Sequence, residues 1–183
     1  MRHPAIDQVI DALRTWTPVD ERERTSIAVL MVEIARLDDP SSETADPVHV
    51  TASAIVVNDA GDKVALHLHK RLQMWLQPGG HIEAGESPWE GALREAHEET
   101  GLEVRHHDGA PCFVHVDVHA GPKGHTHLDL RYLVRAPETA MSPAEGESPD
   151  AAWFTWADAE SIADAGLIGA LRAVRTLLTA RND

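Results

Sequence analysis

The sequence predicts an α/β or α+β fold in which helices pack on a β-sheet, preceded by a helical N-terminal segment. Three observations lead to this prediction. Residues 4–37 place apolar side chains at helical spacing, and residues 48–134 contain two pairs of segments in which apolar and polar residues alternate. An amphipathic helix is predicted between these pairs, and another at residues 167–180. This order of elements is typical of α+β proteins and of α/β/α layers.

The N-terminal segment is predicted to form a helical hairpin. Apolar residues recur every three or four positions in residues 5–16, and a second helical stretch follows at residues 20–37. The next ten residues, DDPSSETADP, have the composition of a loop. We therefore divide the chain into a helical extension, residues 1–46, and a main domain, residues 47–183.

Two β-hairpins are predicted in the main domain. The segments VHVTASAIVV and VALHLHKR flank the turn NDAGD, and the segments CFVHVDVH and HLDLRYLV flank AGPKGHT. A short strand, AWFTW, is predicted before the C-terminal helix. The helix between the hairpins has capping signals at both ends. Ser87 is its N-cap, Pro88 occupies the first helical position, Glu90 completes a capping box, and Gly101 ends the helix.

Composition excludes several classes of protein. The formal net charge of −14 disfavours binding to nucleic acids, whose affinity depends on Lys and Arg. The single cysteine, Cys112, excludes an internal disulfide and a multi-cysteine zinc site. The sequence shows neither a signal peptide nor an apolar segment long enough to span a membrane, so we expect a cytoplasmic protein without a membrane partner. A phosphate-containing ligand would need a metal cation to mediate its contact.

Like charge is concentrated in the segment REAHEETG, residues 94–101. Glu95, Glu98 and Glu99 share one helix face and repel one another. The paired glycines in the preceding WLQPGGHIEAGE allow a backbone carbonyl to approach a ligand. Carboxylate and carbonyl oxygens suit Mg²⁺ or Mn²⁺, and such an ion would relieve the repulsion. The alternative is a solvated acidic helix face.

Residues 80–102, GHIEAGESPWEGALREAHEETGL, resemble the Nudix box: Gly, five residues, Glu, seven residues, Arg-Glu, an apolar residue, any residue, Glu-Glu, any residue, Gly and an apolar residue. The fixed positions are all present, as Gly80, Glu86, Arg94, Glu95, Glu98, Glu99 and Gly101. A weaker resemblance extends over residues 48–160 and leaves out the N-terminal helices. It implies an α/β/α sandwich with a mixed sheet, and metal-dependent hydrolysis of a diphosphate linkage in a nucleoside diphosphate derivative or related small molecule.

The resemblance also implies roles for the residues of the box. The bound metal, Mg²⁺ or Mn²⁺, would neutralise charge on phosphate oxygens and help to deprotonate water. Arg94 would orient the carboxylates, and Glu86 would pair with Arg94. The implied metal ligands are Glu98 and Glu99, joined by Glu95 and by the carbonyl of Gly80. The identity of the general base is left undecided, and the candidates are Glu95, Glu145, Glu147 and Asp150.

The second hairpin carries a ladder of polar side chains on one face of each strand. The members of this polar ladder are His115, Asp117, His119, His127, Asp129 and Arg131. We interpret the ladder as part of a substrate cleft, in which Trp75 could stack on a base. The expected substrate-binding residues are therefore His115, Asp117, His127, Arg131 and Trp75. The alternatives are a solvent-facing sheet surface, a further metal site formed by imidazoles and, for Trp75, packing in the core.

Two other kinds of function are compatible with these features. A Nudix isomerase of the isopentenyl-diphosphate type would need a catalytic cysteine near a histidine. Cys112 lies near His115, but it lacks the surrounding sequence of that activity. A ligand-sensing module would keep the fold without turnover, and the intact box argues against this loss. The sequence does not identify the substrate, and the N-terminal helices are a candidate surface for a homodimer.

Overall fold

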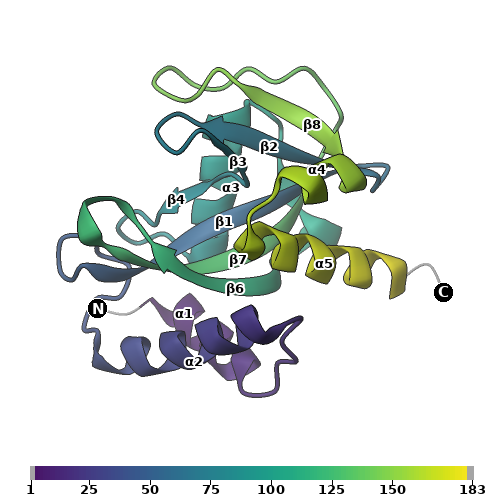
Figure 1. Cartoon of the computed structure of the whole chain (residues 1–183). Helices are drawn as coiled ribbons and strands as arrows, with labels where there is room; N and C mark the ends of the chain where they lie inside the picture. The colour runs from purple at the N-terminus through teal and green to yellow at the C-terminus, as the bar shows by residue number, and fades with distance from the viewer. Residues whose placement is uncertain (1–2, 181–183) are drawn as a thin grey trace.

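A mixed, eight-stranded β-sheet forms the centre of the molecule, which is seen in a computed structural model that describes residues 3–180 (Figure 1). The long strands are β1 (Val48–Asn58), β2 (Lys63–His69), β6 (Cys112–Ala120) and β7 (Thr126–Ala136). The short strands are β3 (Met74–Leu76), β4 (Gly79–His81), β5 (Arg105–His106) and β8 (Ala151–Thr155).

Both predicted hairpins are confirmed, because β1 pairs antiparallel with β2 and β6 pairs antiparallel with β7. A parallel pairing of β1 with β7 joins the hairpins along the whole of both strands. The short strand β4 pairs with β1, which places Gly80 opposite Ala52 at the centre of the sheet. The predicted strand near residue 152 is confirmed as β8, which pairs with β2.

The described residues form five α-helices: α1 (Pro4–Leu13), α2 (Glu21–Arg36), α3 (Pro88–Thr100), α4 (Trp156–Ile162) and α5 (Ala165–Ala180). Helices α3 and α5 lie on opposite sides of the sheet (Figure 1). Ala92 of α3 shares a hydrophobic cluster with Val56 of β1, whereas Leu167 of α5 shares another with Ile55. Neighbouring residues of β1 thus face different layers. The expected α/β/α sandwich is confirmed.

The N-terminal helices form the predicted hairpin and lie along β6, at an edge of the sheet (Figure 1). The backbone N–H groups of Val116 and Val118 donate hydrogen bonds to Glu23 Oε1 and Ser26 Oγ, at 3.2 and 3.0 Å. These side chains occupy the edge where another strand could pair. The apolar face of α1 belongs to the same hydrophobic cluster as β1 and α3, and the division of the chain at residue 46 stays a prediction. No helix within residues 3–180 is long and apolar enough to cross a membrane.

Candidate functional site

Helix α3 begins and ends as its capping residues predict. The Ser87 N–H donates to Glu90 Oε2 at 2.8 Å, and the Glu90 N–H donates to Ser87 Oγ at 3.4 Å. Gly101, with φ +70°, ends the helix in the left-handed conformation. A Cβ at Gly101 would overlap the carbonyl group of Ser142. These contacts fix the helix between β4 and the loop that follows β7.

Glu99 is the most deeply buried of the three glutamates, with 8% of its surface exposed. Its Oε2 accepts a hydrogen bond from the Gly79 N–H at 2.9 Å, and its Oε1 lies 3.4 Å from His67 Nδ1. Glu95 packs against Gly80, where an added Cβ would lie 2.5 Å from Glu95 Oε1. The carboxylates of Glu95 and Glu99 therefore contact strand β4 directly.

Arg94 connects the carboxylates around it. Its Nε and Nη2 donate to the two oxygens of Glu86, both at 3.1 Å. Its Nη1 donates to Glu95 at 2.9 Å and to Glu98 at 3.1 Å. Its Nη2 also donates to the carbonyl of His81 at 2.8 Å, which ties the guanidinium to β4. One positive charge is thus shared by three carboxylates.

The carboxylates of α3 are electrostatically crowded. Burial raises the pKa of Glu99 to about 8, with a further increase from the negative charges of Glu95, Glu147 and Glu98, against the hydrogen bond from Gly79. Burial also raises the pKa of Glu95, although its hydrogen bond and attraction to Arg94 oppose the change. A positive charge bound between these groups would stabilise their ionised forms.

A cavity of about 290 Å³ lies beside this cluster, and its lining includes His67 and Gly79, which contact Glu99. His127 and Arg131 of the polar ladder line this cavity, which we call the sheet cavity, together with Gly80 and the small polar residues Thr51 and Ser53. His115 and Asp117 are not among the described residues that line it. His119 and Asp129 of the ladder also line the cavity, so the covered part of the ladder consists of His115 and Asp117.

A buried ionic network joins the covered Asp117 to Arg131 and Asp129, which line the sheet cavity. Arg22 of α2 holds Asp117 through Nε–Oδ1 and Nη2–Oδ2 contacts of 2.6 and 3.1 Å. Arg131 donates to Asp117 at 3.3 Å, to Asp129 at 2.8 Å and to the Gly166 carbonyl at 2.7 Å. Asp117, Asp129 and Arg131 are each at most 3% exposed, so the alternative of a solvent-facing surface is wrong for these residues.

Asp129 and His115 complete this buried region. Asp129 accepts hydrogen bonds from Ser53 at 2.7 Å and from Thr51 at 3.2 Å. His115 has no exposed surface and lies under α5, where a Cβ at Gly169 would be 2.7 Å from its Nε2. Helix α5 can approach the ladder this closely because it carries glycine at this position.

Comparison with known proteins decides the family. The model of the NUDIX domain matches residues 47–173 of the chain, which include β4, α3 and the whole carboxylate cluster. The chain belongs to the Nudix family. Its Nudix box is the unit formed by β4, the following loop and α3.

Two solved structures show how far the likeness extends. A Nudix-family hydrolase from Clostridium perfringens is 32% identical, with a TM-score of 0.61, over 70% of this chain and 97% of that one. An Ap4A hydrolase from C. elegans, solved as a binary complex, is 22% identical with a TM-score of 0.58, over 72% of this chain and 97% of that one. The second likeness concerns the fold alone.

A curated relative is a probable DHNTP pyrophosphohydrolase from Lactococcus lactis subsp. cremoris, 33% identical over 102 residues. The match covers 54% of this chain and 60% of that protein's length. The N-terminal helices lie outside the residues matched by the Nudix model.

Of the three loop residues that are candidates for the general base, Glu147 is the one that approaches the Nudix box. It lines a small cavity together with Glu99 and His67, whereas the side chains of Glu145 and Asp150 are exposed and do not line it. The loop is attached to α3, because the Ala144 N–H donates to the carbonyl of Glu98 at 2.8 Å.

Trp75 packs in the core. Its ring lies 4.9 Å from that of Phe154 in an edge-to-face arrangement, and it joins the hydrophobic cluster beneath α5. It is not among the described residues that line the sheet cavity. The packing of Trp75 therefore matches the core alternative and gives no support to base stacking.

Sequence reasoning missed several residues of the site. Thr51 and Ser53 line the sheet cavity, and Arg71 lines both this cavity and the small cavity beside Glu99. The sequence does contain a signal for Thr51 and Ser53, because they alternate with alanines in β1 and so share one face of the strand. Arg71 lies in the connection from β2 to β3, where no sequence pattern predicts which way a side chain points.

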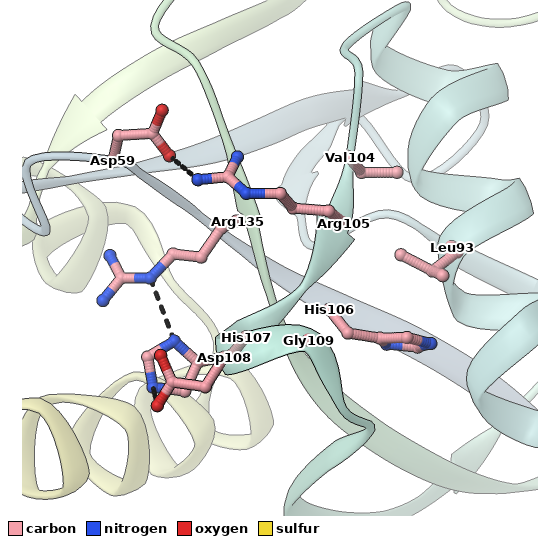
Figure 2. Close-up of a pocket in the computed structure, with 9 residues that line it drawn as sticks. All are labelled: Asp59, Leu93, Val104, Arg105, His106, His107, Asp108, Gly109 and Arg135. Atoms are coloured by element: carbon pink, nitrogen blue, oxygen red, sulfur yellow. Dashed lines mark hydrogen bonds and ion pairs between the residues drawn. The ribbon is translucent and has the colours of Figure 1, made fainter.

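A wider cavity of about 730 Å³ lies elsewhere, between α3, β5 and the end of β7 (Figure 2). Its charged groups contact one another. Arg105 pairs with Asp59 at 2.5 Å, and Arg135 Nε donates to His107 Nδ1 at 3.2 Å. The acidic residues of the Nudix box are not among its lining residues. We therefore assign this cavity no role in the reaction, although it has the greater volume.

Proposed function

We propose that this protein is a metal-dependent pyrophosphohydrolase that cleaves a diphosphate linkage in a nucleoside diphosphate derivative or a related small molecule. The observation that carries the proposal is the crowding of Glu95, Glu98 and Glu99 against β4, with a raised pKa at Glu99. Membership of the Nudix family supports the same reaction class. The structure and the comparisons provide no observation that favours an isomerase or a sensing module.

The residues of the Nudix box fit a hard divalent cation, Mg²⁺ or Mn²⁺. The proposed donors are all oxygens, from the carboxylates of Glu95, Glu98 and Glu99 and from the Gly80 carbonyl. A Cβ at Gly80 would lie 2.5 Å from the carboxylate oxygen of Glu95, so a larger residue there would displace this proposed ligand. When bound, the cation would neutralise phosphate oxygens and favour deprotonation of a water molecule.

Other residues of the chain then have distinct roles in the proposed reaction. Arg94 orients Glu95 and Glu98, and Glu86 holds Arg94 in place. We place Glu147 as the general base that takes the proton of the attacking water, because it lines the cavity next to Glu99. Glu95 is the alternative base within the box.

The sheet cavity is the proposed binding site for the rest of the substrate. His127 and Arg131 line it, but the donors of Arg131 are engaged by Asp117, Asp129 and a backbone carbonyl. Arg71 is exposed and lines both cavities, so we assign it the contact with the substrate phosphates. Asp117 is proposed to act indirectly, by holding Arg131 through a hydrogen bond, and His115 by packing beside Arg131 as its register partner in the β6–β7 pair.

The proposal is tested by incubating the purified chain with Mg²⁺ or Mn²⁺ and a panel of diphosphate compounds. The panel includes nucleotide sugars, ADP-ribose, dinucleoside polyphosphates, oxidised nucleoside triphosphates and DHNTP, the compound named for the Lactococcus relative. Chromatography and phosphate release identify the bond that is cleaved. We expect cleavage of at least one compound at a phosphoric anhydride bond, abolished by excess chelator. No turnover of any compound with either metal would overturn the proposal.

A further inference from the structure

Three histidines from three different strands meet at one end of the sheet. His49 of β1 is the register partner of His127 in the parallel β1–β7 pair, and His81 of β4 pairs opposite Thr51 on the other side of β1. One ring nitrogen from each histidine lies within 4.8 Å of the others. The ring centroids are 5.1 Å apart for His49–His81 and His49–His127, and 5.6 Å apart for His81–His127.

The ring nitrogens in this cluster are buried and lack ordinary partners. His49 has no exposed surface. The backbone of Asp46 approaches its ring, but neither ring nitrogen makes a well-formed hydrogen bond within the described part of the chain. Nε2 of His127 also has no hydrogen-bond partner, and Nε2 of His81 has none but lies 3.5 Å from Glu43 Oε2. Buried imidazole nitrogens are normally hydrogen-bonded or bound to a metal, because leaving them without a partner costs free energy. One cation bound by all three rings would provide that partner.

We propose that His49, His81 and His127 form a binding site for Zn²⁺ or a similar borderline transition-metal cation, separate from the carboxylate site of the Nudix box. Three imidazoles suit Zn²⁺, whereas the all-oxygen donors on α3 suit Mg²⁺. A tetrahedral site with Zn–N bonds of about 2.0–2.1 Å has nitrogens roughly 3.3 Å apart, so modest side-chain rotations complete the geometry.

A fourth ligand is available from the loop between α2 and β1. Glu43 Oε2 lies 3.5 Å from His81 Nε2, and the side chain of Glu43 is partly exposed, so it can turn toward a cation. Two further histidines surround the cluster, with His125 5.2 Å from His49 and His119 5.4 Å from His127 between ring centroids. A cation here would join β1, β4 and β7 next to Gly80, and would attach the loop after the N-terminal helices to the sheet. We therefore assign it a structural role.

The test measures binding of Zn²⁺ to the full chain, stripped of metal and then held in excess Mg²⁺ so that the carboxylate site is occupied. Calorimetry gives the stoichiometry, and Co²⁺ in place of Zn²⁺ reports tetrahedral nitrogen coordination by visible absorption. The variants are His49→Gln, His81→Gln and His127→Gln. His106→Gln is the matched control, since His106 lies in the wide cavity and outside the cluster. Circular dichroism verifies the fold of each variant, and the partly exposed His81 keeps the test valid if a buried variant does not fold.

We expect one equivalent of Zn²⁺ per chain, a tetrahedral Co²⁺ spectrum and a rise in melting temperature on adding Zn²⁺. Each cluster variant should lose at least about tenfold in affinity, a loss that removing even a hydrogen-bond partner of a metal ligand can cause. His106→Gln should bind as the wild type does. Unchanged binding in the folded cluster variants, or loss of Zn²⁺ binding in Glu98→Gln, would overturn the proposal. These results are independent of whether the Nudix site hydrolyses diphosphates.

Discussion

The guanidinium of Arg94 and the carboxylate of Glu86 form a two-point ion pair, with Nε–Oε1 and Nη2–Oε2 distances of 3.1 Å each. The remaining nitrogen of the same guanidinium reaches Glu95 and Glu98. The orientation of the acidic cluster thus depends on the planar shape of one side chain. A single positive charge without that shape could not make all of these contacts.

Replacing Arg94 with lysine tests this dependence. Lysine keeps the charge but cannot hold two carboxylate oxygens in a fork, so we expect turnover to fall by about 10–100-fold through misplaced ligands. Steady-state kinetics over a range of Mg²⁺ concentrations measures the change. The matched control is Arg175→Lys, at an exposed pair with Glu160, where kinetics should not change. Wild-type kinetics in Arg94→Lys would contradict the orienting role.

Gly101→Ala tests the junction between α3 and the loop that carries Glu147. Alanine is strained at φ +70°, and its Cβ would overlap the Ser142 carbonyl, so we expect a loss of more than about 1 kcal/mol in the free energy of unfolding. Urea denaturation measures it. Gly109→Ala is the control, because Gly109 has a similar φ of +76° with open space around it. Equal losses in the two variants would exclude a specific clash with Ser142.

The buried His115 predicts a stability change at acidic pH. Burial, aided by the charge of Arg131, lowers the pKa of His115 to about 4 in the folded protein, against about 6.5 in an unfolded chain. Between these values the unfolded state binds more protons, so stability falls as pH decreases from about 6.5 to about 4. The contribution of His115 is about 3 kcal/mol over that interval.

The measurement compares unfolding free energies of wild type and His115→Leu at several pH values. The variant lacks the titrating ring, so we expect its stability to fall less steeply than that of the wild type between pH 6.5 and pH 4, whatever its absolute stability. Acidic groups elsewhere contribute to both proteins alike. Parallel pH profiles would show that His115 does not titrate differently in the folded and unfolded states.

The features that could be predicted from sequence depend on local patterns. The caps of α3 at Ser87 and Gly101, both hairpins and the Nudix box are each encoded within a short stretch of residues. The parallel pairing of β1 with β7 and the insertion of β4 beside β1 join distant segments, so no local signal marks them. The pattern therefore predicted the long strands, β8 and the helices α1, α2, α3 and α5, but neither α4 and the short strands β3, β4 and β5 nor the centre of the sheet.

The polar ladder shows the same limit at the level of side chains. Alternation correctly placed Asp117 on one face of β6, but it could not show which elements cover that face. Arg22, which binds Asp117, is 95 positions away in the sequence, and Gly166 approaches from α5. Burial of the ladder follows from these long-range contacts.

The central claim is that the charge of the Nudix helix binds a catalytic cation, and Glu99→Gln tests it most directly. Glutamine keeps the shape of the side chain but removes an anionic metal donor. In metal-free protein it replaces a carboxyl whose pKa is raised to about 8, so little charge is lost at neutral pH. We therefore expect the variant without metal to be as stable as the wild type or slightly more stable. Glu103→Gln, at an exposed position just beyond the helix, is the control.

The decisive measurement is the change in melting temperature on adding Mg²⁺, recorded with turnover for wild type, Glu99→Gln and Glu103→Gln. Ligand binding to the native state stabilises it by mass action. Mg²⁺ should raise the melting temperature of wild type and Glu103→Gln clearly more than that of Glu99→Gln, whose turnover should fall by orders of magnitude. Equal stabilisation of all three proteins, or wild-type turnover that persists in excess chelator, would contradict the metal site.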